Sequence, residues 1–126
     1  MEEKKLILVG NGDSGTDVSR MSRSIYFDAA FDQQHARSAS GLIVRGEGGE
    51  ILVSKSVLHN NIGTLFAAEA HAGLKALQLG RSKGFKDIQI LENFYAHAIA
   101  TEALRKGEGH YLEGAIPITI RRTGGR

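Results

Sequence analysis

The stretch Gly63-Thr-Leu-Phe-Ala-Ala-Glu-Ala-His-Ala-Gly-Leu-Lys-Ala-Leu-Gln-Leu-Gly80 predicts an amphipathic helix, and its apolar face determines how the rest of the chain can pack. Apolar residues recur at spacings of three and four, the period of one helix face, at Leu65, Ala68, Ala72, Ala76 and Leu79. Glu69 falls on the same stripe. A carboxylate that faces a core is costly unless a compensating charge, such as a metal ion, lies beside it. The pattern therefore predicts that this helix packs on another layer of the fold, and that Glu69 has a functional role.

Three strand-like runs precede this helix. In the first, Ile25 to Phe31, apolar residues alternate with a second set that includes Asp28, which is the period of a half-buried strand. Ala39 to Arg45 and Glu50 to His59 are the second and third runs, joined by the Gly-rich turn at residues 46–49. We expect these runs to form an antiparallel meander of two hairpins.

A fourth strand and a second helix follow. Thr64 is a plausible N-cap for the first helix, which can end at Gly80 or Gly84. Lys86 to Leu91 reads as a strand, and the right-handed crossover rule places it parallel to the first strand, at the centre of the sheet. Asp28 then lies in the middle of the sheet, with the start of the Glu69 helix close by.

The second predicted helix runs from Phe94 to Lys106. Asn93 is its expected N-cap, and Gly107 is expected to close it. Its apolar stripe predicts a core-facing side made of Ala96, Ile99, Ala100 and Ala103.

Length and composition indicate one domain of a soluble intracellular protein, in the cytoplasm or nucleus. The chain has 126 residues, is 41% hydrophobic and carries a formal net charge of +2. It has no Cys, which excludes disulfides, thiolate metal sites and cysteine nucleophiles. No apolar run approaches the roughly 18 residues of a membrane-spanning helix. The slightly basic charge is compatible with nucleic acid as a partner but does not by itself indicate it.

The periodic segments divide the chain into three parts. Residues 1–24 are expected to be a leader, residues 25–107 the domain, and residues 108–126 a C-terminal tail. Within the leader, Gly10 to Gly15 has the Gly-x-Gly-x-x-Gly spacing of a dinucleotide site after a short apolar run. A meander follows it instead of a second strand–helix–strand unit, so a nucleotide-binding module stays the weaker alternative.

Four ordered segments carry a resemblance to a known family. They are Ile25-Tyr-Phe-Asp-Ala-Ala-Phe31, the Gly-rich hairpin of residues 41–52, and Ala67-Ala-Glu-Ala-His-Ala-Gly-Leu-Lys-Ala-Leu-Gln-Leu-Gly80, followed by Asn93-Phe-Tyr-Ala-His-Ala-Ile-Ala100. Over about residues 24–107 the chain resembles the ribonuclease H-like domain (RNase H type 1) of plant proteins and retroelements, often labelled reverse-transcriptase-like. The resemblance implies an α/β fold with a mixed sheet: three antiparallel strands, a helix, a parallel fourth strand and a helix.

The resemblance also implies site residues. Asp28 matches the metal ligand of the first strand, and Glu69 matches the ligand of the first helix. His97 occupies the last ligand position, where plant members often carry His in place of Asp. The family's remaining ligand is an Asp in an Asp-Ser pair after the fourth strand, but here residues 90–92 run directly into Asn93. That pair, a middle helix and the fifth strand are therefore expected to be missing, and Glu92 is the nearest acid to the gap.

By resemblance, the activity would be cleavage of the RNA strand in RNA–DNA hybrids with Mg²⁺ or Mn²⁺. Two-metal nucleases use such ions to stabilise the attacking and leaving oxygens at phosphorus. The acid set is incomplete, which argues against full activity. The alternative is a non-catalytic, retroelement-derived remnant that binds nucleic acid or protein.

Overall fold

The computed structural model describes residues 5–9, 22–85, 87–118 and 120. The helices and strands with defined bounds are, in order, β1 (Lys5–Val9), β2 (Ser22–Asp32), β3 (Arg37–Arg45), β4 (Ile51–Asn60), α2 (Leu65–Ser82), β5 (Asp87–Glu92), α3 (Phe94–Lys106) and β6 (His110–Glu113). Both predicted helices and all four predicted strands are present. No helix in the described part of the chain is long and apolar enough to span a membrane.

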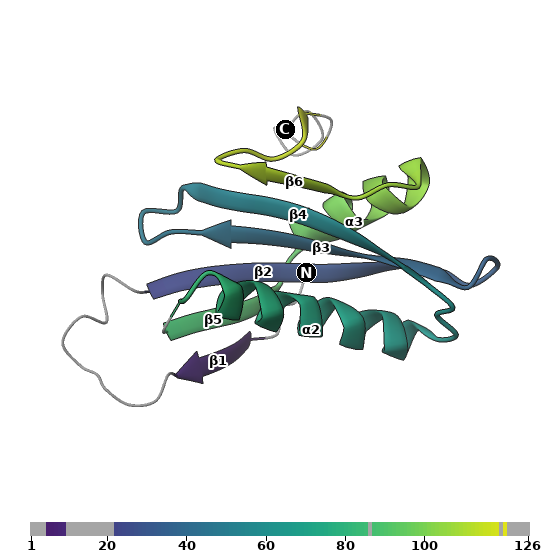
Figure 1. Cartoon of the computed structure of the whole chain (residues 1–126), viewed down its shortest axis with the longest axis horizontal. Coiled ribbons are helices and arrows are strands. Elements are labelled where there is room, and N and C mark those ends of the chain that lie inside the picture. The colour runs from purple at the N-terminus through teal and green to yellow at the C-terminus, as the bar shows by residue number, and fades with distance from the viewer. Residues whose placement is uncertain (1–4, 10–21, 86, 119, 121–126) are drawn as a thin grey trace.

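The strands form one mixed sheet in the order β1-β5-β2-β3-β4-β6 (Figure 1). β2, β3 and β4 pair antiparallel as the predicted meander, and β5 pairs parallel to β2 after the crossover through α2. This confirms the expected α/β mixed sheet with the first and fourth predicted strands side by side at its centre. β5 leads directly into α3, with no strand between them.

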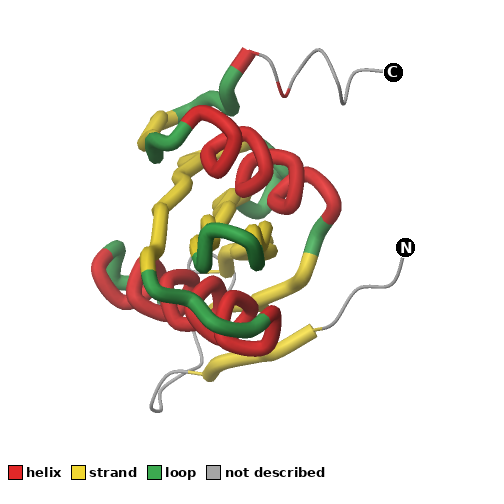
Figure 2. Tube along the Cα trace, turned by 90° about the vertical axis from the view of Figure 1, so that its right-hand side faces the viewer, coloured by secondary structure: helices red, strands yellow, loops and turns green. Residues whose placement is uncertain are grey.

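The two helices cover opposite faces of the sheet (Figure 2). On the α2 face, the apolar core includes Ile25, Leu42, Val44, Ala76 and Leu79. On the α3 face, Ile43 packs with Ile99, and Ala39 packs with Ala100 and Ala103. Alternation along each strand sends neighbouring residues to different faces, so each helix has its own core.

Both helices begin after the predicted N-caps and α3 ends at the predicted Gly107, whereas the C-cap of α2 is Lys83, between the predicted Gly80 and Gly84. The Thr64 hydroxyl accepts a hydrogen bond from the Ala67 N–H at 3.0 Å, and α2 ends at Ser82, just before Gly84. The Asn93 side chain caps α3, and Gly107 closes it in the left-handed conformation that glycine favours. The positions of both helices along the chain are thus set by local sequence.

The prediction that Leu65 belongs to the buried apolar stripe of α2 is wrong. Ala68, Ala72, Ala76 and Leu79 are buried, but Leu65 is 54% exposed. Leu65 is the first residue of the helix, where the chain has only begun to turn back over the sheet. Its side chain therefore lies beyond the contact with β2.

Two strands lie outside the predicted domain boundaries. β1, in the expected leader, pairs antiparallel with β5, from Lys5 opposite Leu91 to Val9 opposite Asp87. β6, in the expected tail, pairs antiparallel with β4. Each covers one outer strand of the central four. Residues 10–21, which include the Gly10 to Gly15 pattern, lie outside the described residues.

Candidate functional site

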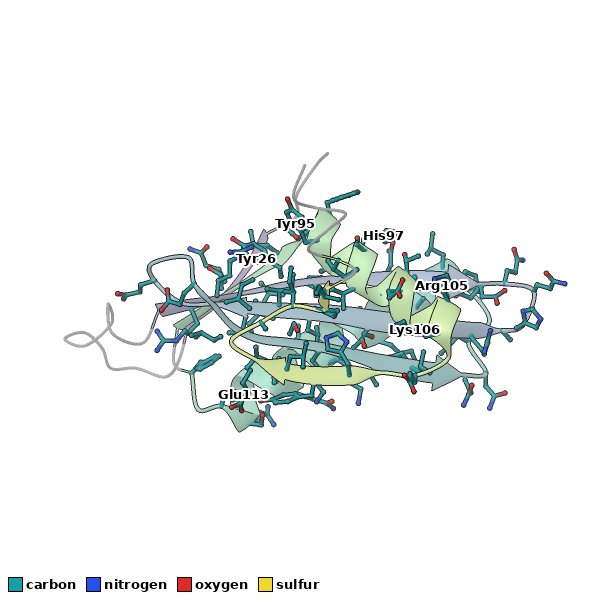
Figure 3. The ribbon with its side chains drawn as sticks, turned by 90° about the horizontal axis from the view of Figure 1, so that it is seen from above. Tyr26, Tyr95, His97, Arg105, Lys106 and Glu113 are labelled. Atoms are coloured by element: carbon teal, nitrogen blue, oxygen red, sulfur yellow. The ribbon has the colours of Figure 1, made fainter. Side chains whose placement is uncertain are left out.

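The structure brings two of the predicted site residues together on the α3 face. The Nδ1 atom of His97 lies 3.4 Å from Oδ2 of Asp28, and the Asp28 side chain is only 24% exposed. The other carboxylate oxygen, Oδ1, accepts a hydrogen bond from the Ala29 N–H at 2.8 Å. Asp28 comes from β2 and His97 from α3, where Figure 3 labels it near the start of the helix. A strand acid and a helix histidine thus form one polar pair.

The hydrogen bond of His97 determines which ring nitrogen is free. Nδ1 lies 3.0 Å from the Ala29 carbonyl oxygen, which can only accept, so Nδ1 carries the proton. In the neutral ring, Nε2 then holds the lone pair. The side chain is 48% exposed, and no described residue hydrogen-bonds to Nε2. Nε2 is therefore the ring atom at which His97 can exchange a proton with a bound molecule.

Close packing between α3 and β3 sets the distance between the pair. Gly41 lies directly opposite Asp28 in the β2–β3 register. A Cβ on Gly41 would overlap the Ala96 carbonyl and crowd the Ala100 nitrogen of α3. Glycine at this position lets the helix backbone lie against the sheet, which brings His97 down to the level of β2.

The end of β5 opens the sheet beside Asp28. The last β2–β5 pair joins Phe27 and Glu92, and the Asn93 N–H then donates to the Phe27 carbonyl at 3.2 Å before the chain enters α3. From Asp28 onward, β3 is the one strand among the described residues that pairs with β2. The Asp28 carboxylate therefore lies next to an open sheet edge, where the two faces of the sheet meet.

Glu69 lies on α2, the helix that covers the other face of the sheet. Its side chain is half-buried, on the flank of the core stripe and not at its centre. It forms no hydrogen bond or ion pair with the residues that the structure describes. The start of α2 does pack on β2, where Ala68 and Ala72 contact Ala29. The proximity of this helix to the Asp28 strand is confirmed, while a metal site shared by Asp28 and Glu69 stays a prediction.

Glu92, the predicted substitute acid, ends β5 opposite Phe27. Its backbone is therefore one register position from Asp28. Its side chain lies outside what the structure describes. A role for Glu92 stays a prediction from its place in the sheet.

The predicted ligands have the right type of atom for a hard cation, although few of them lie together. In the described ranges, no three His, Asp or Glu side chains gather closely enough to hold a metal ion, so Asp28, Glu69 and His97 do not form such a group. Mg²⁺, however, usually takes only one or two carboxylates from the protein and completes its shell with water and phosphate oxygens. Asp28 and Glu69 supply that type of ligand.

Two basic residues of the central strands, Arg45 on β3 and Lys55 on β4, have contacts within the protein. The Arg45 guanidinium donates to the Gly49 carbonyl at 2.7 Å and lies over the Tyr26 ring. The Lys55 ammonium lies over the Tyr111 ring. Both side chains are partly exposed.

Sequence reasoning missed the backbone group that orients His97. The Ala29 carbonyl fixes the tautomer of the ring, and a backbone oxygen leaves no signal in the identity of its residue. The alternation of residues 25–31 did place Asp28 on the face away from Phe27, and this is confirmed: Phe27 contacts α2, and Asp28 contacts α3.

A comparison with protein families agrees with this geometry. A family model described as reverse transcriptase-like matches residues 26–101, which is more than half of the 126-residue chain and includes Asp28, Glu69 and His97. No curated protein and no solved structure matches the chain. The order and direction of the central strands fit the ribonuclease H-like fold implied by the resemblance. The chain therefore belongs to the reverse transcriptase-like family, which is ribonuclease H-like.

Proposed function

We propose that this chain is a nuclease domain that binds RNA–DNA hybrids and cleaves the RNA strand, with Mg²⁺ or Mn²⁺ as cofactor. The observation that carries the proposal is the Asp28–His97 pair at the open edge beside the end of β5. An acid and a proton carrier lie there within the segment that matches the family. A phosphodiester bond needs both functions: compensation of its negative charge and transfer of a proton.

Each site residue has a separate task in this proposal. Asp28 and Glu69 would hold the cation, reaching it from the two faces that meet at the sheet edge, and Glu92 would be a third acid nearby. The cation, when bound, would neutralise charge on the scissile phosphate. His97 accepts a proton from the attacking water at Nε2, or returns one to the departing sugar oxygen. The Ala29 carbonyl keeps the ring in the orientation that this transfer requires.

The exposed side of α3 next to His97 would receive the hybrid. RNA is distinguished from DNA by its 2′-hydroxyl groups. The protein can contact these groups when the RNA strand of the hybrid lies across the site. Phosphate contacts would position the duplex without reading its sequence. Recognition by shape is therefore expected, and cleavage should not depend on the sequence of the hybrid.

A labelled RNA–DNA hybrid tests this function. The wild-type chain should cleave the RNA strand with Mg²⁺ or Mn²⁺ and not with EDTA. Asp28→Asn and Glu69→Gln should each lower the rate by about 100-fold or more, since each removes an anionic group at the reacting phosphate. Glu102→Gln is the matched control, because Glu102 pairs with Arg105 and Lys106 further along α3. It should retain the wild-type rate.

The alternative is a remnant that binds nucleic acid or protein without cleaving. The observation in its favour is that the described residues offer no group of three metal ligands. If the folded wild-type chain binds the hybrid and leaves its RNA intact with both ions, the nuclease proposal fails and this alternative holds. The weaker nucleotide-binding alternative at Gly10 to Gly15 is tested by titration with a dinucleotide.

A further inference from the structure

A pair of histidines lies on the α2 face, away from the Asp28–His97 pair. His59 on β4 and His71 on α2 have ring centroids 4.9 Å apart, with an angle of 32° between the ring planes. Both side chains are half-buried. Because α2 follows β4 and returns across the sheet, two residues from consecutive elements meet there. Nothing in the proposed nuclease function uses this pair.

The spacing of the two rings suits a shared metal ion. Histidine nitrogens bind Zn²⁺ at about 2.1 Å, so two imidazoles on one ion hold their ring centroids about 5 Å apart. The ring of His71 has no hydrogen-bond partner among the described residues. It can therefore turn about its side-chain torsions without breaking a hydrogen bond.

One ring nitrogen of His59 is hydrogen-bonded within the protein. Its Nε2 atom lies 2.8 Å from the hydroxyl oxygen of Ser40, a fully buried residue on β3. Metal-bound histidines usually have one ring nitrogen hydrogen-bonded in this way, which fixes the ring and leaves the other nitrogen for the ion. For His59 that other nitrogen is Nδ1. The neutral form of the ring is the form that binds a metal ion.

We propose that His59 and His71 form an open, two-imidazole site for a divalent transition-metal ion such as Zn²⁺ or Ni²⁺, with Ser40 positioning the His59 ring. Imidazole suits these ions, whereas Mg²⁺ prefers oxygen ligands, so the site is distinct in chemistry from the carboxylate site. Water or a small anion would complete the coordination shell. Lys75, one helical turn after His71, is a nearby positive charge that weakens binding of the cation.

Calorimetric titration of the full chain with Zn²⁺, in excess Mg²⁺ to occupy carboxylates, tests the proposal. We expect one Zn²⁺ per chain, with affinity at least tenfold lower in His71→Ala, a substitution that removes a ligand and preserves helix propensity. His97→Ala should bind as the wild type does, which separates this site from the candidate nuclease site. Equal affinity of His71→Ala and wild type would overturn the proposal.

Two further variants, which keep both imidazoles, distinguish a loss of Zn²⁺ binding from a loss of folding. Ser40→Ala keeps both imidazoles and should still weaken Zn²⁺ binding by about tenfold, because it releases the His59 ring. Lys75→Gln should tighten Zn²⁺ binding by about threefold, the size expected of an exposed charge interaction. If the cluster were an anion site, inorganic phosphate would bind instead and Lys75→Gln would weaken it. That outcome would contradict the metal assignment.

Discussion

His97 and His110 both connect distant segments of this chain, but their ring nitrogens are used in opposite ways. The Nδ1–H of His97 donates to the Ala29 carbonyl, and Nε2 has no hydrogen-bond partner in the described part of the chain. Both ring nitrogens of His110 are occupied, with Ser56 at 2.8 Å from Nδ1 and Ser54 at 3.1 Å from Nε2.

The Ser54 hydroxyl also donates to the Ala115 carbonyl, so its oxygen must accept from the Nε2–H of His110. The Ser56 hydroxyl then donates to Nδ1, while the Ser56 oxygen accepts from the His110 backbone N–H at 3.0 Å. Every polar atom of this network has a partner, and β6 is held to β4. A closed network of this kind stabilises structure, whereas the free nitrogen and adjacent acid of His97 leave room for chemistry.

Exchange of each histidine for glutamine should separate the two roles most strongly. His97→Gln cannot transfer a proton and should lower hybrid cleavage by about 100-fold, with the free energy of unfolding within about 0.5 kcal/mol of wild type. His110→Gln should lower the free energy of unfolding by about 1–3 kcal/mol and leave cleavage by the folded fraction unchanged. Single-turnover cleavage and urea denaturation measure the two effects. Equal loss of cleavage in both variants would remove the distinction.

Gly41→Ala tests whether the close packing of α3 on β3 determines the position of His97. The added methyl group would enter the space of the Ala96 carbonyl, so we expect a loss of about 3 kcal/mol in the free energy of unfolding. Gly63→Ala is the control, because a Cβ there meets nothing within 4 Å. Denaturant titration of both variants is the measurement, and equal stability of the two would refute the close approach.

The closed network around His110 should make the stability of the protein depend on pH. Burial, with a smaller effect from Lys106, lowers the pKa of His110 below 6.5. The unfolded chain therefore binds more protons than the folded chain just below pH 6.5, and stability falls as the pH drops from 6.5 toward the folded pKa. His59, whose pKa is also lowered, acts in the same direction.

His110→Ala should reduce this pH dependence, measured as the free energy of unfolding between about pH 5 and pH 7.5. Tyr111→Phe is the control, because the next residue along a strand points to the opposite face. It should keep the wild-type slope. An unchanged slope in His110→Ala would show that the His110 network does not sense protons.

The two helix caps give the smallest expected effects. The Asn93 side chain accepts hydrogen bonds from the Tyr95 and Ala96 N–H groups, whereas Thr64 accepts one from Ala67. Replacement by Ala should cost about 1 kcal/mol at each site. Both replacements should also lower cleavage, because α2 carries Glu69 and α3 carries His97. A thermal melt and the cleavage assay together check both caps.

Much of this fold could be predicted because its signals are local. Thr64, Asn93 and Gly107 act on backbone groups within a few residues, and all three cap or close the helices as expected. The alternation in β2 assigns Phe27 and Asp28 to different faces. The crossover rule then places β5 beside β2.

The parts that could not be predicted depend on partners far along the chain. Lys5–Val9 is strand-like, but nothing in it specifies pairing with β5, and β6 has only four residues. The contact between His59 and His71 depends on how α2 crosses β4. The orientation of His97 depends on a backbone carbonyl. These are properties of the assembled sheet.

Nitrogen-15 spectra of the histidine rings test the central claim most directly, because they show which ring nitrogen carries the proton. In the wild-type chain above neutral pH, we expect His97 to be protonated at Nδ1 and His110 at Nε2. Both tautomers follow from hydrogen bonds to carbonyl oxygens that can only accept. If His97 instead carries its proton at Nε2, the nitrogen assigned to proton uptake is not free and the role of His97 is refuted.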